Sequence, residues 1–161
     1  MDVRAIFGIS VGMSLVSSIV AARLFAWPAL IARDRRHALM WLVAPHMFLR
    51  FVGLSFLIPG VVSEHLPLAW AAPAAYGDLG AGILAIAATV ALAQASSLAT
   101  TAVWVFNVWG FADLLFGFYQ GARLIHQPGW FGAGFFIVTA LVPVLLVSHA
   151  LIFMLLVRRT S

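Results

Sequence analysis

The chain of 161 residues contains no cysteine and no lysine. Without cysteine it can form no disulfide, thiolate nucleophile or cysteine-ligated metal centre. Without lysine it cannot form the Schiff bases on which retinal and pyridoxal chemistry depend. These two absences exclude several classes of enzyme and photoreceptor, but they leave the redox compartment open.

Charged residues are also scarce, at 9% of the chain, whereas hydrophobic residues make up 64%. A soluble fold of this length could not bury so much apolar surface, so we expect the lipid bilayer to surround the chain. The net charge of +4 comes from arginines that stand singly or beside apolar segments. We therefore expect a role for them in membrane topology and no nucleic-acid partner.

The apolar residues form segments that are long enough, or nearly so, to cross about 30 Å of hydrocarbon as helices. They are residues 5–22 with an extension to 32, 38–62, 76–93, 102–118 and 134–157. The predicted fold class is an all-α, polytopic transmembrane helical bundle of about five spans, forming a single domain over residues 1–161. A four-span bundle is the alternative if the first segment is a cleaved signal peptide. The weakly charged "MDVR" start and the long first segment favour five.

The distribution of arginine predicts how the bundle is oriented. The sequence "RDRRH" at 33–37 and the pair Arg158 and Arg159 share one side of a five-span bundle, while Arg4 and Arg123 lie on the other. The positive-inside rule then places the N-terminus outside and the C-terminus inside, in a multi-pass protein of a bacterial inner membrane. Aromatic residues at the expected boundaries agree: Trp41 and Trp104 inside, and Trp70, Tyr76, Tyr119 and Trp130 outside.

Small residues predict how the spans pack, because helices in lipid associate where their backbones can approach closely. The segment 76–93 has such residues at every fourth position: Gly77, Ala81, Ala85, Thr89 and Ala93. We expect it to be the central helix, joined by the short link 94–101 to the next segment in an antiparallel hairpin. The pairs Gly8–Gly12 and Gly117–Gly121 predict faces for homo-oligomer contacts.

Prolines interrupt two segments that also carry histidines. Pro45 lies one residue before His46, and Pro143 lies six residues before His149. Because proline cannot complete the helical hydrogen-bond pattern, we expect kinks at both positions.

Arg50 lies about halfway through the segment 38–62, where an exposed arginine would cost at least about 2.5–3.5 kcal/mol. We expect it to face protein, with Asp113 as its partner. Arg50 is twelve residues past Ala38 and Asp113 is eleven past Ala102, so two helices running in the same direction bring them to similar depths. Asp78, at the expected start of its segment, is a shallower alternative partner, or a helix N-cap.

A second polar layer is predicted one turn toward the cytoplasm. His46 precedes Arg50 by four residues, and the same depth count brings His149 and Asn107 to the level of His46. The ordinary interpretation of these residues is hydrogen bonding between helices. Two histidines on separate helices are also the pattern of axial ligands to haem b, which is the alternative to the prediction of no cofactor and no metal.

Two stretches have a resemblance to a known family. "RFVGLSFLIPGVV" (50–62) and "AAYGDLGAGILAIAATVAL" (74–92) look like the first half of the small DoxX-type four-helix membrane proteins. The basic residue expected after the first helix of that pattern is absent, and an additional apolar segment precedes the match. The prediction of function does not rest on this resemblance.

Three functions fit these patterns. The first is binding or transport of a small or lipid-like ligand, or of a proton, with the candidate residues His46, Arg50, Asp78, Asn107, Asp113 and His149. The second is a structural or accessory membrane subunit. The third is a redox enzyme acting on a quinone or lipid, with or without haem. No G-x-S-x-G, H-E-x-x-H, P-loop or Rossmann pattern points to other chemistry.

Overall fold

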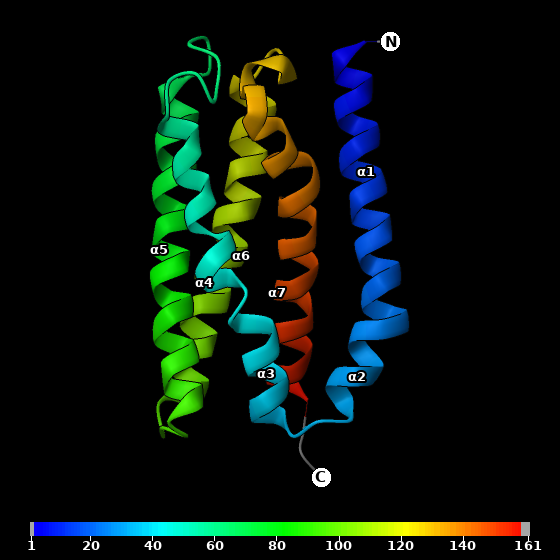
Figure 1. The fold of residues 1–161 in the computed structure, drawn as a ribbon, viewed down its shortest axis with the longest axis vertical. Helices are drawn as coiled ribbons and strands as arrows, with labels where there is room; N and C mark the ends of the chain where they lie inside the picture. Colours follow the sequence, from blue (N-terminus) through cyan, green and yellow to red (C-terminus); the bar gives the residue numbers. More distant parts are fainter. Residues whose placement is uncertain (1, 159–161) are drawn as a thin grey trace.

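The computed structural model describes residues 2–158. Five of its helical segments are long and apolar enough to cross a membrane: Val3–Ile31, Arg35–Leu57, Leu68–Ala93, Ala99–Leu124 and Ile137–Val157. They run alternately along one direction and back, so that the N-terminus and the C-terminal end of the last helix lie at opposite ends of the bundle (Figure 1). The helical class is as predicted.

The first two segments are made of several pieces. The first comprises α1 (Val3–Ala21), a π-helical turn η1 (Ala22–Ala26) and α2 (Trp27–Ile31). The second comprises α3 (Arg35–Val43), α4 (His46–Leu49) and the 3-10 helix η2 (Phe51–Leu57). The helix breaks at Pro45, as predicted, because proline lacks the N–H that would continue the pattern. The break leaves Arg50 at the junction between α4 and η2, and the segment ends at Leu57 rather than at residue 62.

The central hairpin is longer than predicted. α5 (Leu68–Ala93) and α6 (Ala99–Leu124) extend beyond the predicted ranges 76–93 and 102–118. Pro73 lies in the second turn of α5, where the sequence pattern suggested a loop. As a result, Asp78 is inside α5 and buried, so its predicted place at a helix start is wrong.

The last segment consists of a 3-10 helix η3 (Pro128–Gly134), a π-helical turn η4 (Ile137–Leu141) and α7 (Val142–Val157). The π-turn lies directly before Pro143, where a kink was predicted. Proline at this position cannot donate to a carbonyl of the preceding turn, and a wider turn is one way to absorb the lost bond.

The buried face of α5 differs from the predicted stripe. The buried small residues include Ala75, Ala81, Ala85 and Ala88, whereas Ala93 is exposed. Four residues rotate a helix by more than one full turn, so a strict four-residue spacing drifts off any single face. Together with the other buried residues of α5, the buried small residues form a face with steps of three or four residues, which keeps it pointing at α6 and η2. This face is Ala71, Ala75, Asp78, Gly82, Ala85, Ala88 and Leu92.

α1 stands at the edge of the bundle (Figure 1). It has no buried residue and packs against η3, η4 and α7. Ser14 Oγ donates to Ala140 O at 3.2 Å, and Arg4 donates to His126 O at 2.8 Å. The remaining surface of α1 is apolar and exposed. The core is therefore built mainly by the four later segments.

Three arginines, one in the link between α2 and α3 and two in the first turn of α3, bind the C-terminal ends of helices. Arg33 donates to Ala29 O at 2.5 Å, Arg35 to Leu156 O at 2.5 Å, and Arg36 to Leu92 O at 3.2 Å. The last carbonyls of a helix lack partners within it and carry partial negative charge, so a guanidinium satisfies both needs. The arginines predicted to mark one side of the membrane thus also cap α2, α7 and α5.

Asp34, which lies between Arg33 and Arg35, caps the start of α3. Asp34 accepts a hydrogen bond from the His37 backbone N–H at 3.1 Å, which makes it the N-cap of α3. This bond, together with the one to the His37 side chain, lowers the pKa of Asp34.

Buried apolar residues form two clusters. One lies toward the C-terminal end of the bundle around Val43, Phe106 and Ile152, and the other toward the opposite end around Phe56, Trp70 and Phe131. Trp70 was predicted at the membrane boundary but is 5% exposed, and its indole N–H donates to Gly117 O at 2.9 Å. On the second, third and fourth segments, one charged residue lies between the part that belongs to one cluster and the part that belongs to the other. These residues are Arg50, Asp78 and Asp113. His149, on the last segment, lies within the part that belongs to the cluster toward the C-terminal end.

Candidate functional site

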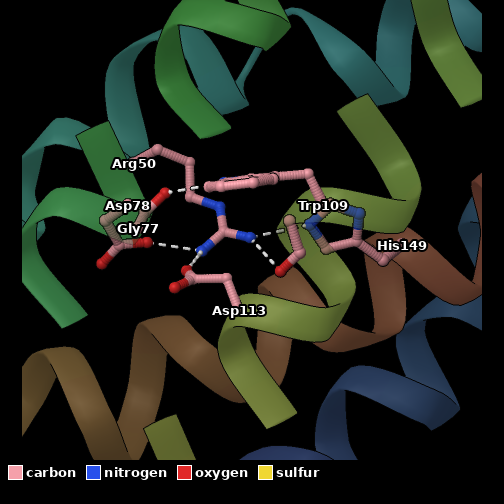
Figure 2. Close-up of polar contacts among 7 residues, drawn as sticks. Arg50, Gly77, Asp78, Trp109, Asp113 and His149 are labelled. Atoms are coloured by element: carbon pink, nitrogen blue, oxygen red, sulfur yellow. Dashed lines mark hydrogen bonds and ion pairs between the residues drawn. The ribbon is translucent and has the colours of Figure 1, made fainter. Parts of the chain in front are cut away.

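Arg50 is the centre of the polar cluster and is fully buried. Its Nη1 atom contacts the Asp78 carboxylate and lies 3.2 Å from Asp113 Oδ2. Its Nη2 atom donates to Gly110 O at 2.5 Å and to His149 Nε2 at 3.0 Å. Figure 2 shows the guanidinium between the two carboxylates and the histidine ring. Four segments of the bundle therefore meet at one side chain.

Glycine makes room for each charged group. A Cβ atom at Gly53 would collide with the Asp78 carboxylate, and one at Gly77 would collide with that of Asp113. A Cβ at Gly110 would lie 2.7 Å from Arg50 Nη2. In lipid, small residues usually bring helices together. Here they also form the space in which the charges meet.

The predicted pair Arg50–Asp113 is present, but Asp78 is the closer partner. Asp78 was predicted to be a shallower alternative because its helix was expected to begin near Tyr76. The true start at Leu68 carries Asp78 to the depth of Arg50. The structure thus brings together both predicted acidic candidates around one guanidinium.

The two predicted polar layers are joined through His149. Guanidinium nitrogen can only donate, so His149 Nε2 must accept, and its proton must lie on Nδ1. Nδ1 then donates to Asn107 Oδ1 at 2.7 Å, while Asn107 Nδ2 donates to His149 O at 3.1 Å. All three contacts fit a neutral imidazole. Asn107 and His149 therefore orient the arginine from the side opposite to its carboxylates.

His46 packs beside this chain of contacts without binding Arg50. Its Nε2 atom lies 3.0 Å from Ser148 Oγ, and its ring contacts Phe106 and His149, with centroid distances of 5.0 and 4.6 Å. Bis-histidine ligation places the haem macrocycle between the two rings. In the packing described, the rings of His46 and His149 touch each other directly, so this geometry does not accommodate haem between them. Nor, within residues 2–158, do three or more His, Asp or Glu side chains gather in a way that could hold a metal ion.

The charges in the cluster do not balance. With both carboxylates ionised, Asp78 and Asp113 contribute two negative charges and Arg50 one positive charge. His149 is neutral by the argument above, and no further cation of the described residues contacts either carboxylate. The cluster therefore carries one excess negative charge unless it binds a proton or another cation.

A cavity of about 460 Å³ ends at these two carboxylates. Its apolar walls come from α1, η2, α5, α6, η3, η4 and α7, and Arg4 and His126 lie at the end where the chain begins. The walls combine small and aliphatic residues with the aromatic side chains of Phe7, Phe56, Trp70, Phe118 and Phe131. Its size lies in the range of small-molecule pockets, and an apolar cavity with few polar groups is typical of such pockets.

Asp113 also borders a second, more open groove on the outer face of α5 and α6. The groove is lined by exposed side chains such as Tyr76, Val108 and Trp109. The Trp109 indole N–H donates to Gly77 O at 3.2 Å, which holds the ring next to the site (Figure 2). Asp113 thus lies between the internal cavity and the outer surface of the bundle.

Residues 6–157 match the model of a family described as a domain of unknown function, DUF8737. The chain belongs to this family. No curated protein and no solved structure shows significant similarity to it. The function of this DUF8737 protein must therefore be inferred from the site itself.

Sequence reasoning missed several parts of the site in the DUF8737 chain. The aromatic wall of the cavity includes Phe7 and Phe131, whose segments are 124 residues apart and meet only in the fold, with ring centroids at 5.9 Å. Gly117 and Gly121, which the sequence offered only as candidates for oligomer contacts, line the cavity. The sequence contained one signal for a site with two carboxylates: Asp78 is a second acidic residue in an apolar segment, and such a residue needs a partner.

Proposed function

We propose that the protein binds a small or lipid-like molecule, or a proton, within the membrane, in the cavity that ends at Asp78 and Asp113. The observation that carries this proposal is the position of the carboxylates. A purely structural ion pair would be enclosed on all sides, whereas these two line an apolar cavity. Because Asp113 also borders the outer groove, we extend the proposal to transport, with Asp113 on the route between the two spaces.

The proposed setting is a bacterial inner membrane, with five spans, the N-terminus outside and the C-terminus inside. Its support is the concentration of Arg33, Arg35 and Arg36 at one end of the bundle. The predicted C-terminal pair of arginines adds to this argument only through Arg158, because Arg159 lies outside the described residues. Because the chain has no cysteine, single cysteines report orientation cleanly. We expect a membrane-impermeant maleimide to label Glu64→Cys but not Ser97→Cys in intact cells. The opposite result would invert the topology.

Two alternatives make different predictions. If the protein is an accessory subunit, the cavity is a packing defect and retains no ligand. If it is a redox enzyme with haem on His46 and His149, the purified protein shows a Soret band that His149→Ala removes. The contact between the two histidine rings favours binding over this haem arrangement.

The test of the binding function is to fill the cavity. Gly117 lines it, and a Cβ at this position meets nothing within 4 Å, so Gly117→Leu should occupy the space without disturbing the backbone. Gly12→Leu is the matched control, because Gly12 is also helical and also meets nothing within 4 Å, but lies exposed on α1.

We expect mass spectrometry of the purified proteins to find the same bound molecule in the wild type and Gly12→Leu, and to find it depleted in Gly117→Leu. Equal amounts in all three, or no bound molecule in wild-type protein purified in two different detergents, would contradict the proposal. Gly8 and Gly12 leave an open face on α1 that supports the proposed homo-oligomer, so native mass spectrometry compares the oligomeric size of Gly12→Leu with that of the wild type. A bound molecule retained in Gly12→Leu, whatever its oligomeric size, separates filling of the cavity from an effect on assembly.

A further inference from the structure

We infer that the ligand of the cavity is a monovalent organic cation with an apolar body, and that its binding releases one proton from the carboxylate pair of Asp78 and Asp113. This inference rests on the proposed function and names the chemical class of its ligand. It follows from the charge of the cluster, the lining of the cavity and the set of groups that face the pair.

The charge of the cluster gives the sign of the ligand. Two carboxylates share one guanidinium, so one negative charge remains in the middle of the bundle. An uncompensated charge is costly in an apolar environment. In the absence of a ligand, a proton on the carboxylate pair removes that charge. A cation with one positive charge can replace the proton without changing the net charge of the site.

The lining of the cavity gives the body of the ligand. The carboxylates of Asp78 and Asp113 lie at its inner end, and Arg50 lies behind them and does not line it. Aromatic side chains, including Phe56, Trp70 and Phe131, line the same cavity. Aromatic faces attract organic cations, most strongly where water is excluded. An anion would face both carboxylates and the negative faces of the rings.

The groups around the pair permit proton exchange with few competitors. Arg50 contacts it from the α4–η2 junction, and neutral His149 contacts Arg50 from α7. From α1 and the α6–η3 link, Arg4 and His126 lie at the other end of the cavity, where Arg4 donates to the His126 carbonyl. A guanidinium group cannot be deprotonated in a protein. The proton that leaves on cation binding must therefore come from a carboxylate.

The experiment compares two molecules of the same shape. Phenyltrimethylammonium carries the positive charge, and tert-butylbenzene is its neutral isostere. Titration calorimetry of the full-length protein in detergent measures both affinities. Repeating the cation titration in two buffers with different ionisation enthalpies gives the number of protons released. We expect phenyltrimethylammonium to bind at least about tenfold more tightly and to release about one proton.

Variants assign the effect to the carboxylates. Asp113→Asn leaves Arg50 balanced by Asp78 alone, so we expect it to lose the preference for the cation and the proton release, while tert-butylbenzene binds as before. Asp78→Asn should act in the same direction. Glu64→Gln removes a carboxylate in an exposed link and is the control that changes neither quantity.

The outcomes separate this inference from the proposed function. If the two isosteres bind equally to the wild type and Gly117→Leu blocks both, the cavity binds ligands but the cationic class is wrong. If the cation binds the wild type and Asp113→Asn equally, the carboxylates do not select it and the inference fails. If neither molecule binds the wild type, the inference fails, and the molecules that co-purify decide the proposed function.

Discussion

The charge imbalance around Arg50 predicts an unusual order of mutational effects. Arg50→Leu leaves two buried carboxylates without a counter-ion, and the loss of one partner from a buried ion pair costs about 3–5 kcal/mol. Asp113→Asn, by contrast, removes the excess charge and leaves one guanidinium facing one carboxylate. We expect it to cost less than about 1.5 kcal/mol, the value of an ordinary hydrogen bond. Asp78→Asn should fall between them, because Asp78 is the closer partner of Arg50.

The distances give the size of the coupling. At 3.2 Å and an effective dielectric constant of about 20, the attraction between Arg50 and Asp113 is about 5 kcal/mol before the costs of desolvation. Those costs offset much of it. We therefore expect a double-mutant cycle between Arg50→Leu and Asp113→Asn to show a coupling of about 1–3 kcal/mol.

The assay is reversible unfolding in mixed micelles with increasing SDS, followed by circular dichroism for the wild type, the three single variants and the double variant. The order of costs is the decisive measurement. If Asp113→Asn destabilises the protein as much as Arg50→Leu does, Arg50 requires Asp113 as its counter-ion and the second carboxylate is not surplus to folding. If the cycle is additive, the guanidinium and the carboxylate of Asp113 do not interact in the folded protein.

Three further predictions use the same assay. Gly77→Ala should destabilise the bundle by about 1–3 kcal/mol because its Cβ displaces Asp113. Gly8→Ala has open space around it and should be neutral or stabilising by up to about 1 kcal/mol. Equal effects of the two variants would contradict the collision between Gly77 and Asp113. Asn107→Leu removes the acceptor of the His149 ring N–H and should cost about 1–3 kcal/mol, so a neutral result would mean that this bond is not formed. The pKa of Asp34 is lowered in the folded state, so its stabilising effect is present above its ordinary pKa of about 4 and is lost as the pH falls through the lower folded value. Asp34→Ala should remove that part of the acid sensitivity, and an unchanged pH profile would refute the cap.

The depth of Arg50 and Asp113 could be predicted from the sequence because both lie on helices that run in the same direction. Counting residues from the same end of two such helices compares the heights of Arg50 and Asp113 at a fixed rise per residue. The comparison holds even if both helix starts are misplaced, as long as they are misplaced by similar amounts. The structure places the ends at Arg35 and Ala99 instead of 38 and 102, an equal displacement of three residues. The errors cancelled, and the pair was found.

Asp78 could not be placed in this way because its helix runs in the opposite direction, so an error at its start changes its apparent depth directly. The stretch before Tyr76 contains Pro67 and Pro73, which argue against a continuous helix, yet α5 begins at Leu68. Tertiary packing overrides the local signal here: Trp70 and Ala71 are buried against the rest of the bundle. The stabilisation that comes from burying them is not visible in the sequence of this segment alone.

The second carboxylate is the feature that a structural role does not explain. If the cluster served only to fix the register of the helices, one carboxylate would neutralise the charge of Arg50. Gly110 O and His149 bind Nη2 independently of Asp113, and Nε has no hydrogen-bond partner among the described residues. Adding another ionisable group at this depth increases the cost of folding unless something cancels its charge. A protein whose Asp113→Asn variant folds at least as well as the wild type, yet no longer distinguishes a cation from its neutral isostere, would retain Asp113 for binding rather than for stability.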